Sequence, residues 1–583
     1  MAGRGVHCVV GRQMSRTPIC RFMRLKSPDG QRSENAEMTR RQRVLEQAAA
    51  PVAERIRRIE STPLPRNIAA LLDEAARDVP DAQAWVFIGT GESITYRALR
   101  DEVNRLANGM RAAGVRAQSH VAVMLPNIPA MPTTWLALAR IGAVIVPVNV
   151  RYTGHELHYT LQDSDADFLV IHADYLGILK KMPEHVPGIA GRIVVVGGGP
   201  GEYARWQDLL AKSDAEFSPD IEPAPDDLMN IQYTSGTTGL PKGCLLTHRY
   251  WLTCAKAYSA CDFRTYKRIL AGNPFFYMTP QWQLLMAFFQ RGTLYVAPRL
   301  STTHYVEWIR EHKIDFCLFR EAYYREPPAP LDADNEIVRV NIYGCRKEVH
   351  ADMERRFDFV VRSAFGMTEI GIGTFVPLEA VEMTGSGSCG ICAPFRECRI
   401  ADPHGNTVAD GQQGELLVRG AGILKGYYKR PQATAAAFHG DWFRTGDVAY
   451  RDARGFFYIV GRLKEMIKRA GENVAANEVE AVIGEIPGIA EVAVVAVPDE
   501  LRGEEVKAYV TLADGVGRAE LTPERIVALC SAKLAVFKIP RYIEYRDAPL
   551  PRTPSGKIRK QTLMTEKADL RAGSWDRLKG CRN

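Results

Sequence analysis

The chain has 583 residues, more than the about 250–300 at which a single hydrophobic core stops growing, so at least two packed units are expected. Its 46% hydrophobic and 25% charged residues are typical of a folded globular protein and exclude a largely disordered chain. The net charge of +7 is spread over 75 basic and 68 acidic residues, which argues against a nucleic-acid partner. No apolar run approaches the about 18–20 residues of a membrane span.

Basic residues gather at the N-terminus, where six arginines and lysines precede the first acidic residue, Asp29. Three interpretations stay open: an organellar transit peptide, a disordered leader, or an over-long gene start with Met38 opening the real protein. We predict a basic, disordered leader over residues 1–60. The 12 cysteines show no disulfide framework, which favours reduced thiols and a cytoplasmic location.

Helical and strand patterns alternate between residues 96 and 171. Apolar residues recur at helical spacing from Leu99 to Met110, and Gly114 follows where a helix C-cap belongs. The same region predicts strands at 120–125, 143–147 and 168–171 and helices at 134–140 and 156–162. This alternation is typical of an α/β domain with a largely parallel sheet.

The second half of the chain changes to short strands with glycine turns, at 414–420 and 455–460, with the triplet Gly-Tyr-Tyr between them. We interpret these strands as a β-rich subdomain that closes the large domain. After Arg462 the pattern changes again, to a compact α+β unit with strands at 491–497 and 506–512 and a helix at 523–534. The predicted domains are 61–463 and 464–583.

A glycine-rich loop follows an apolar strand pattern at 228–232 and reads, over 233–243, Tyr-Thr-Ser-Gly-Thr-Thr-Gly-Leu-Pro-Lys-Gly. Glycines expose backbone N–H groups, and hydroxyls and a lysine add further donors, so the loop suits a polyphosphate. The candidate ligands are Thr234, Ser235, Gly236, Thr237, Thr238, Gly239 and Lys242. The loop is not a Walker A motif, because its lysine follows a proline and no Ser or Thr follows the lysine.

This segment resembles the signature loop of the adenylate-forming superfamily, which contains acyl-CoA synthetases, luciferases and the adenylation domains of peptide synthetases. Residues 364–369 (AFGMTE) resemble the family's Y-G-M-T-E segment. The resemblance implies that Phe365 stacks on adenine, that Thr368 contacts phosphate and that Glu369 holds Mg²⁺. A carboxylate is a hard oxygen ligand of the kind that Mg²⁺ uses beside substrate phosphates.

Further family motifs follow in order. The segment 445–447 (TGD) resembles the family's T-G-D, which implies that Asp447 binds the ribose hydroxyls, and Arg462 matches an arginine that also reaches the ribose. Lys464 falls at the family's hinge position. Residues 471–474 resemble a segment that lines the coenzyme A channel, which assigns Gly471 and Glu472 to that channel.

The segment 550–558 resembles the C-terminal loop that carries the family's essential lysine, here Lys557. The resemblance implies that ATP and Mg²⁺ bind over the glycine-rich loop and that a substrate carboxylate attacks the α-phosphorus and releases pyrophosphate. Lys557, Glu369 and Thr234 are the expected catalytic residues. The small domain is then expected to rotate about the hinge so that coenzyme A reaches the acyl-adenylate.

Two stretches depart from the family pattern. Where relatives commonly have G-G-A-P, residues 343–346 read Tyr-Gly-Cys-Arg; Gly344 keeps the close approach to adenine. At 277–283 (YMTPQWQ) the chain is aromatic and amide-rich, so we expect a substrate pocket with polar recognition, formed by Tyr277, Trp282, Gly366 and Met367. Similarity to carnitine and crotonobetaine ligases makes a cationic substrate a hypothesis, because aromatic rings attract cations.

The expected function is therefore that of an acid–thiol ligase acting on a small carboxylic acid, with ATP, Mg²⁺ and coenzyme A. The alternatives are an enzyme that loads a carrier protein in trans, a luciferase-like oxidase, and a catalytically silent nucleotide-binding protein. A zinc site at Cys389, Cys392 and Cys398 is not expected, because no fourth ligand stands at a matching spacing. The acid and the oligomeric state, including a homo-oligomer, stay open.

Overall fold

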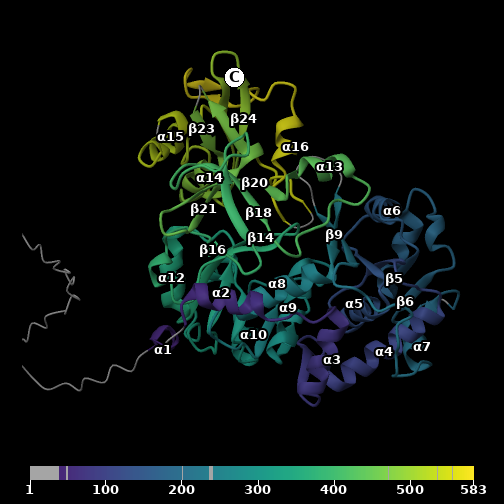
Figure 1. Cartoon of the computed structure of the whole chain (residues 1–583). Coiled ribbons are helices and arrows are strands. Elements are labelled where there is room, and N and C mark those ends of the chain that lie inside the picture. The colour runs from purple at the N-terminus through teal and green to yellow at the C-terminus, as the bar shows by residue number, and fades with distance from the viewer. Residues whose placement is uncertain are drawn as a thin grey trace, which may run out of the picture. The chain divides into compact units, whose positions relative to one another are not determined.

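The computed structural model describes residues 39–46, 50–199, 201–234, 241–469, 472–534, 536–553 and 556–582, and residues 40–583 form one compact unit. Within the described residues, no helix is long and apolar enough to cross a membrane. The described part of this unit contains four β-sheets with helices packed on them (Figure 1). The α/β class predicted from the sequence is confirmed.

One sheet carries the strand that leads into the glycine-rich loop. Its order is β7-β6-β5-β3-β4-β8-β9, and every neighbouring pair is parallel except the β8–β9 hairpin. Its central strands read as apolar runs because both of their faces are buried. The strands are β3 (His120–Met124), β4 (Val144–Pro147), β5 (Phe168–His172), β6 (Ile193–Val196), β7 (Ala204–Arg205), β8 (Leu228–Thr234) and β9 (Lys242–Thr247).

A second sheet of nine strands has the order β16-β15-β14-β13-β12-β10-β11-β1-β2 among the described residues. Its middle is parallel, and β2, β15 and β16 pair antiparallel at its two ends. The strands are β1 (Gln83–Phe87), β2 (Ser93–Thr95), β10 (Arg268–Ala271), β11 (Thr293–Val296), β12 (Phe316–Leu318), β13 (Arg339–Ile342), β14 (Val360–Met367), β15 (Gly371–Phe375) and β16 (Ile391–Cys392).

Helices connect and cover these two sheets. In α4 the apolar face predicted from Leu99 to Met110 is fully buried, and the helix begins where the Thr95 hydroxyl accepts a bond from the N–H of Ala98. Helix α8 leads from β9 in one sheet to β10 in the other and lies beside α9 (Figure 1). The helices up to β14 are α1 (Arg40–Glu46), α2 (Val52–Ser61), α3 (Ile68–Asp78), α4 (Tyr96–Ala112), α5 (Ala130–Ile141), α6 (Gly154–Asp163), α7 (Trp206–Ala211), α8 (His248–Ala260), α9 (Met278–Gln290), α10 (Tyr305–Glu311), α11 (Glu321–Tyr324) and α12 (Lys347–Phe357), with 3₁₀ turns η1 (Ala173–Lys181) and η2 (Pro187–Ile189).

The predicted β-rich part of the chain is a five-stranded antiparallel sheet. Its order is β17-β18-β20-β19, and β21 pairs with β20. Alternating burial along β20 shows that one face of the strand packs inward. The elements are η3 (Val381–Met383), β17 (Glu397–Ala401), β18 (Gly414–Arg419), α13 (Pro431–Ala436), β19 (Phe438–His439), β20 (Trp442–Arg451) and β21 (Phe457–Arg462).

After β21 the chain builds a mixed sheet with its own hydrophobic cluster, which includes Ile467, Val494 and Ile526. The strand order is β23-β22-β25-β26-β27-β28, and β24 pairs with β25. The elements are η4 (Leu463–Glu465), β22 (Met466–Arg469), β23 (Glu472–Ala475), α14 (Ala476–Gly484), β24 (Ile489–Asp499), β25 (Gly503–Leu512), α15 (Pro523–Ser531), η5 (Val536–Lys538), β26 (Tyr542–Tyr545), α16 (Lys560–Thr565), β27 (Trp575–Asp576) and β28 (Cys581–Arg582).

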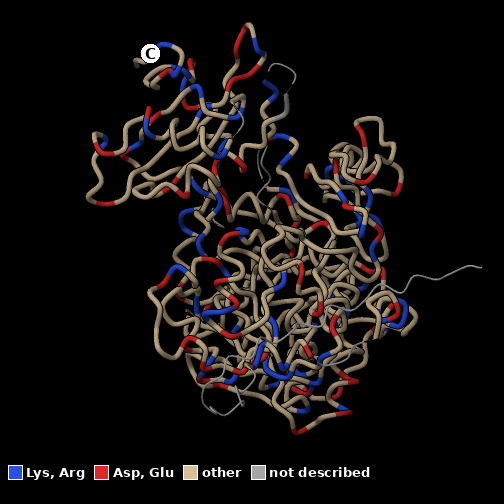
Figure 2. Tube along the Cα trace, turned by 90° about the vertical axis from the view of Figure 1, so that its left-hand side faces the viewer, with Lys and Arg blue, Asp and Glu red and all other residues tan. Residues whose placement is uncertain are grey.

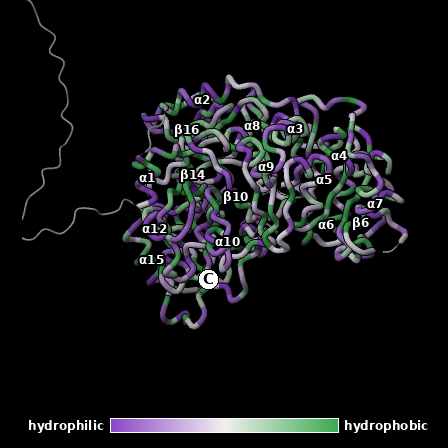
Figure 3. The backbone as a smooth tube through the Cα atoms, turned by 90° about the horizontal axis from the view of Figure 1, so that it is seen from below, coloured by the Kyte–Doolittle hydropathy of each residue, from purple (hydrophilic) through white to green (hydrophobic). Residues whose placement is uncertain are grey.

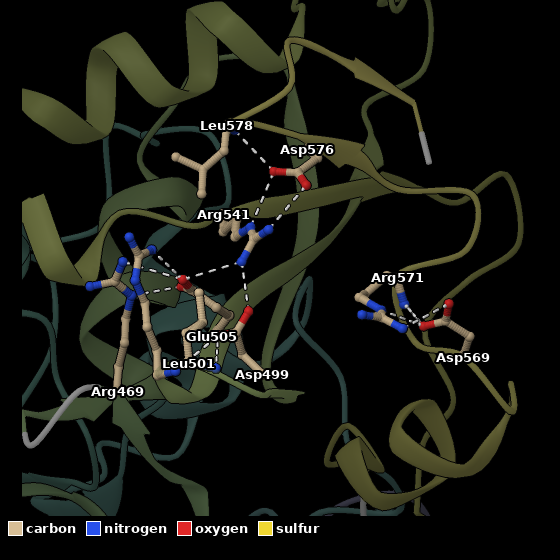
Figure 4. A network of polar contacts seen from close by, with 10 residues as sticks. Arg469, Asp499, Leu501, Glu505, Arg541, Asp569, Arg571, Asp576 and Leu578 are labelled. Carbon is tan, nitrogen blue, oxygen red and sulfur yellow. Dashed lines mark hydrogen bonds and ion pairs between the residues drawn. The ribbon is translucent and has the colours of Figure 1, made fainter.

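Within this small domain, an ion-pair network joins β27 to the end of β24 (Figure 4). Arg541 donates to Asp499 Oδ2 at 2.7 Å and to Asp576 Oδ1 at 3.2 Å. Arg469 Nε donates to Glu505 Oε2 at 2.6 Å, and the Glu505 side chain is fully buried. A buried carboxylate needs such partners, because an unpaired charge inside a protein is strongly destabilising.

Charged residues of both signs are spread along the chain, and the hydrophobic residues are concentrated in the buried helices and strands. Lysines and arginines are interspersed with acidic residues along the described chain (Figure 2). Helix α5 and strand β6 consist mostly of hydrophobic, buried residues, and hydrophilic residues are frequent between the elements (Figure 3). The buried apolar surface of these elements supplies the main driving force for folding.

The disordered leader expected over 1–60 is wrong for its second part. Residues 40–46 and 52–61 form α1 and α2, and Val44 and Ile59 are buried. The N–H of Arg40 donates to Asp358 Oδ2 at 2.9 Å, which fixes the start of α1 against the end of α12. Apolar residues at helical spacing within a basic segment carried the signal. Residues 1–38, including Met38, lie outside the described residues.

Candidate active site

The glycine-rich loop connects the two strands of the β8–β9 hairpin. Thr234 and Lys242 are the last pair of Cα partners before the loop, so the two ends of the loop lie side by side. A Cβ on Gly243 would lie 2.4 Å from Ile231 Cγ2, which explains a glycine at that position. Residues Ser235, Gly236, Thr237, Thr238 and Gly239 lie outside the described residues, and their phosphate contacts stay predictions.

Lys242 and Glu369 meet at a third side chain, Tyr427. The Lys242 ammonium lies 5.2 Å from the centre of the Tyr427 ring, within the range of a cation–π contact. The Tyr427 hydroxyl donates to Glu369 Oε1 at 3.0 Å. Tyr427 was not among the predicted site residues, because the Gly-Tyr-Tyr triplet was interpreted only as a turn; the signal was an aromatic hydroxyl directly after Gly426, which has a φ of +148°.

The Glu369 carboxylate sits in a buried position, with 8% of the residue exposed. Burial raises the pKa of Glu369, and the hydrogen bonds it accepts and the charges of Arg462 and Lys242 oppose this rise. A cation at this carboxylate would replace the hydration lost on burial. One carboxylate beside a polyphosphate is a donor set that Mg²⁺ accepts, so the residues present fit this ion.

Asp447 and Arg462 face each other across the β20–β21 pair, where they are Cα partners. Arg462 Nε lies 3.0 Å from Asp447 Oδ1, while Asp447 Oδ2 is buried and accepts no hydrogen bond within the described structure. Burial raises the pKa of Asp447 to about 6, although Arg462 and Lys557 oppose the rise. The second oxygen is thus a buried acceptor without a donor, which suits a ligand hydroxyl.

Lys557 lies in a loop whose ends are joined by hydrogen bonds, and the charge of its side chain acts on Asp447. The backbone of this loop is fixed by Thr553, whose N–H donates to the Lys557 carbonyl at 2.7 Å and whose hydroxyl accepts from the Lys557 N–H at 3.1 Å. The ammonium of Lys557 is close enough to lower the pKa of Asp447. The charge of this lysine therefore acts on Asp447 of the β20–β21 pair.

The predicted adenine contacts lie on neighbouring strand ends. Phe365 is half-buried on β14, opposite Thr374 of β15. Gly344 has a φ of +71° just after β13, with open space where a Cβ would be, so the backbone there can approach a ligand closely. Arg346, whose role the sequence left open, donates from Nε to Glu321 Oε1 at 2.7 Å.

Aromatic side chains form the expected substrate region. Trp282 stacks on Tyr258 with ring centres 3.9 Å apart, and the Tyr258 and Tyr343 hydroxyls are 2.5 Å apart. Asn149 Nδ2 donates to the Tyr277 hydroxyl at 3.4 Å. Tyr258 was not predicted near this region, because nothing local in the sequence distinguishes it from a core aromatic, and Tyr343 was noted only as the first residue of the segment 343–346. Gly366 and Met367 are the last two residues of β14, opposite Ile372 and Gly371 of β15.

The charge around Tyr277 is positive. Burial raises the pKa of the Tyr277 hydroxyl, and the nearby guanidinium groups of Arg151 and Arg320 act in the opposite direction. A substrate that carries a positive charge near Tyr277 would meet two like charges there.

Two sequence profiles match the chain. The profile described as AMP-binding enzyme matches residues 72–428, and the one described as AMP-binding enzyme C-terminal domain matches residues 478–557. The chain belongs to the AMP-binding enzyme family. The resemblance read from the glycine-rich loop and the motifs that follow it is therefore confirmed.

Relatives of this AMP-binding enzyme include several CoA ligases. Feruloyl-CoA synthase from an Amycolatopsis species is 34% identical over 497 residues, 83% of this chain and 96% of the relative. Crotonobetaine/carnitine–CoA ligase from Citrobacter koseri is 31% identical over 525 residues, 85% and 99% of the two chains. ATP-bound MatB from Rhodopseudomonas palustris matches with a TM-score of 0.74 at 26% identity, over 85% and 98% of the two chains.

The AMP-binding enzyme thus brings part of the predicted set together. Lys242, Glu369, Asp447, Arg462 and Lys557 are linked by contacts or by charge, as described above. Lys464 is exposed in η4, directly after β21. Gly471 and the side chain of Glu472 lie outside the described residues. No cluster of three or more His, Cys, Asp or Glu suited to a metal occurs in the described part of the chain.

Proposed function

We propose that this AMP-binding enzyme activates an aromatic carboxylic acid with ATP to an acyl-adenylate, releases pyrophosphate, and transfers the acyl group to coenzyme A. The observation that carries the proposal is the arrangement around Glu369 and Asp447. The buried Glu369 carboxylate is linked through Tyr427 to Lys242. The buried Asp447 carboxylate pairs with Arg462, and the charge of Lys557 lowers its pKa.

The nucleotide is held by groups on three sheets. The β8–β9 loop would cradle the phosphates, with Thr234 and Lys242 at its two ends. Asp447 Oδ2 would accept from a ribose hydroxyl, and Arg462 would keep that carboxylate ionised and oriented. Phe365 and the open backbone at Gly344 would enclose the adenine.

In the transition state negative charge builds up on the α-phosphate and on the leaving pyrophosphate. The reaction therefore needs positively charged groups beside the α-phosphate. Lys557 and Lys242 would supply this charge from prepositioned side chains, which costs no reorganisation when the reaction occurs. Mg²⁺, held by Glu369, would add a Lewis acid that neutralises phosphate oxygens. The substrate carboxylate is itself the nucleophile, so no side-chain nucleophile is required.

The chemistry around Tyr277 favours an aromatic acid with a neutral polar substituent. The half-buried Tyr277 and the exposed Tyr343 offer aromatic rings and hydroxyl groups for such an acid, and the buried Tyr258 holds the Tyr343 hydroxyl at 2.5 Å. The feruloyl-CoA synthase relative supports this class. A cationic acid, which the carnitine ligase relative suggests, is the second candidate and is disfavoured by Arg151 and Arg320.

The proposal is tested by pyrophosphate release with a panel of acids, with and without coenzyme A. The panel contains hydroxylated cinnamic and benzoic acids, crotonobetaine, carnitine and a fatty acid. We expect release with the aromatic acids and thioester formation when coenzyme A is added. Release without any thioester would indicate a carrier protein as acceptor. No acid-dependent release at all would overturn the proposal, and preference for the cationic acids would overturn its substrate class.

A further inference from the structure

Lys560 lies three residues after Lys557, at the first position of α16, and contacts two carboxylates. Its ammonium is 2.7 Å from Glu465 Oε2 and 2.9 Å from Glu480 Oε1. The Lys560 side chain is only 15% exposed, so the pair of contacts lies largely away from water. Buried lysines are uncommon in proteins unless they are paired, which makes this placement unusual for a surface helix.

The two carboxylates come from different parts of the small domain. Glu465 is the last residue of η4 and directly follows Lys464, the proposed hinge residue. Glu480 lies in α14, where its Oε1 also accepts from the N–H of Val494 at 2.7 Å, which anchors it to β24. Lys560 therefore joins the start of the domain, at the hinge, to the framework of its sheet.

The loop between Lys560 and Lys557 transmits this position. The N–H of Arg559 donates to the Pro551 carbonyl at 2.7 Å, and Arg552 and Ile558 form a backbone bridge. Ile558 packs against the cluster of Ala493, Val495, Tyr509, Leu550 and Leu563. The base of the loop is closed, and only Ile558 and Arg559 separate Lys557 from Lys560 along the chain.

Lys560 stays charged in this setting. Burial lowers the pKa of Lys560, but the charges of Glu480 and Glu465 and the hydrogen bonds to them together raise it by more, so the pKa is raised overall. Burial conversely raises the pKa of Glu480, which the Lys560 charge opposes. The ammonium is thus held as an ion between two partners, and it has no role in the reaction described above.

We propose that Lys560 is a positioning residue, which holds the Lys557 loop on the hinge segment in the orientation that directs the Lys557 ammonium toward Asp447. The inference rests on the proposed function, since it assigns Lys560 to the adenylation half-reaction. Loss of the contact lets the loop move, and adenylation slows because Lys557 is misplaced. Transfer from a preformed acyl-adenylate does not use Lys557 and is spared.

The test measures the two half-reactions separately in Lys560→Met. Single-turnover pyrophosphate release is expected to fall by about 10–100-fold, as expected for misplacement of a catalytic group. Thioester formation from supplied acyl-adenylate and coenzyme A is expected to stay within about 2-fold of the unmodified enzyme, a change of only about 0.4 kcal/mol. Lys560→Arg keeps a cation between the carboxylates and is expected to restore most of the adenylation rate.

A matched control is available in the same domain. Lys507 is fully buried, and its ammonium lies 2.6 Å from Glu544 Oε2, an ion pair that does not involve Glu465 or Glu480. Lys507→Met therefore removes a buried lysine from a carboxylate partner without touching Glu465 or Glu480. It is expected to lower thermal stability and to leave the ratio of the two half-reaction rates unchanged.

The outcomes separate the possibilities. If Lys560→Met lowers both half-reactions by the same factor, or matches Lys507→Met in their ratio, Lys560 only stabilises the domain and the inference is overturned. Weaker adenylation in Glu465→Gln as well as in Lys560→Met, with the transfer step spared, supports it. If the unmodified enzyme performs neither half-reaction with any acid of the panel, the proposed function fails and the inference falls with it.

Discussion

The nucleotide region and the acid region of the large domain are built in opposite ways. The nucleotide region holds charged groups in buried or half-buried pairs, such as Asp447 with Arg462 and Glu369 with Tyr427 and Lys242. The expected acid region around Tyr258 and Trp282 consists mainly of neutral aromatic rings and hydroxyl groups, and Arg151 and Arg320 are its charged neighbours near Tyr277. A charged group lost from the first region leaves its partner unpaired, whereas a hydroxyl lost from the second removes one neutral hydrogen bond. The two regions should therefore differ in their sensitivity to mutation.

The largest expected effect comes from Lys557→Ala. Adenylation should fall by about 10²–10³-fold, because a prepositioned charge that stabilises the transition state is lost. Thioester formation from supplied acyl-adenylate should be spared. Single-turnover pyrophosphate release and thioester formation, measured on the same preparation, check this. An equal loss in both steps would contradict the assignment of Lys557 to the first step.

Asp447→Asn should have the next largest effect. The variant replaces a charged acceptor, and hydrogen bonds to charged groups contribute about 1.5–3 kcal/mol, so kcat/KM for ATP should fall by about 10–100-fold. The measurement is kcat/KM for ATP and for 2′- and 3′-deoxy-ATP. In the unmodified enzyme the analogue that lacks the bonded hydroxyl should be the poorer substrate, and the variant should lose that preference. An unchanged preference would place the ribose elsewhere.

The pH dependence of the nucleotide region follows from the same carboxylate. Because the pKa of Asp447 is raised to about 6, the group becomes protonated as the pH falls through about 6 in the free enzyme. Protonation removes the charge that pairs with Arg462, so kcat/KM for ATP should rise with pH through this range and level off above it. Asp447→Asn should lack this step. A step that persists in the variant belongs to another group.

The acid region should respond least. Tyr277→Phe removes one neutral hydrogen bond, with Asn149, and should lower kcat/KM for a hydroxylated aromatic acid by about 2–10-fold, with the KM for ATP unchanged. Tyr258→Phe is the matched variant, because it removes the contact with Tyr343 and keeps the stacked ring. A loss of about 100-fold in either variant would show that the acid region, too, depends on a charged or strongly coupled group.

Much of the fold was predictable, because local patterns control local structure. The apolar face of α4, the strands β3, β4 and β5 and the α/β class followed from spacing alone. Helix α2 was missed, because its apolar residues are embedded in a basic segment that was interpreted by its charge. The ends of the elements shifted by a few residues, since a chain pattern does not specify where tertiary contacts end a helix.

The site divides in the same way. The residue types of the glycine-rich loop identified Lys242, and the resemblance of the later motifs to those of the family identified Glu369, Asp447, Arg462 and Lys557. Their partners came only from the tertiary structure. Tyr427 is 58 residues from Glu369, Tyr258 is 85 residues from Tyr343, and Lys560 is 95 residues from Glu465.

The sequence by itself determined the α/β class, because periodic apolar residues act over a few neighbouring positions, and its motifs resemble those of adenylate-forming enzymes in type and order. Only the tertiary structure decided which groups are buried together, and therefore which carboxylates have raised pKa values and which lysines are paired. The physical reason is that burial and charge pairing depend on distances in space. These distances are set by the packing of sheets and helices, and no spacing along the chain encodes them.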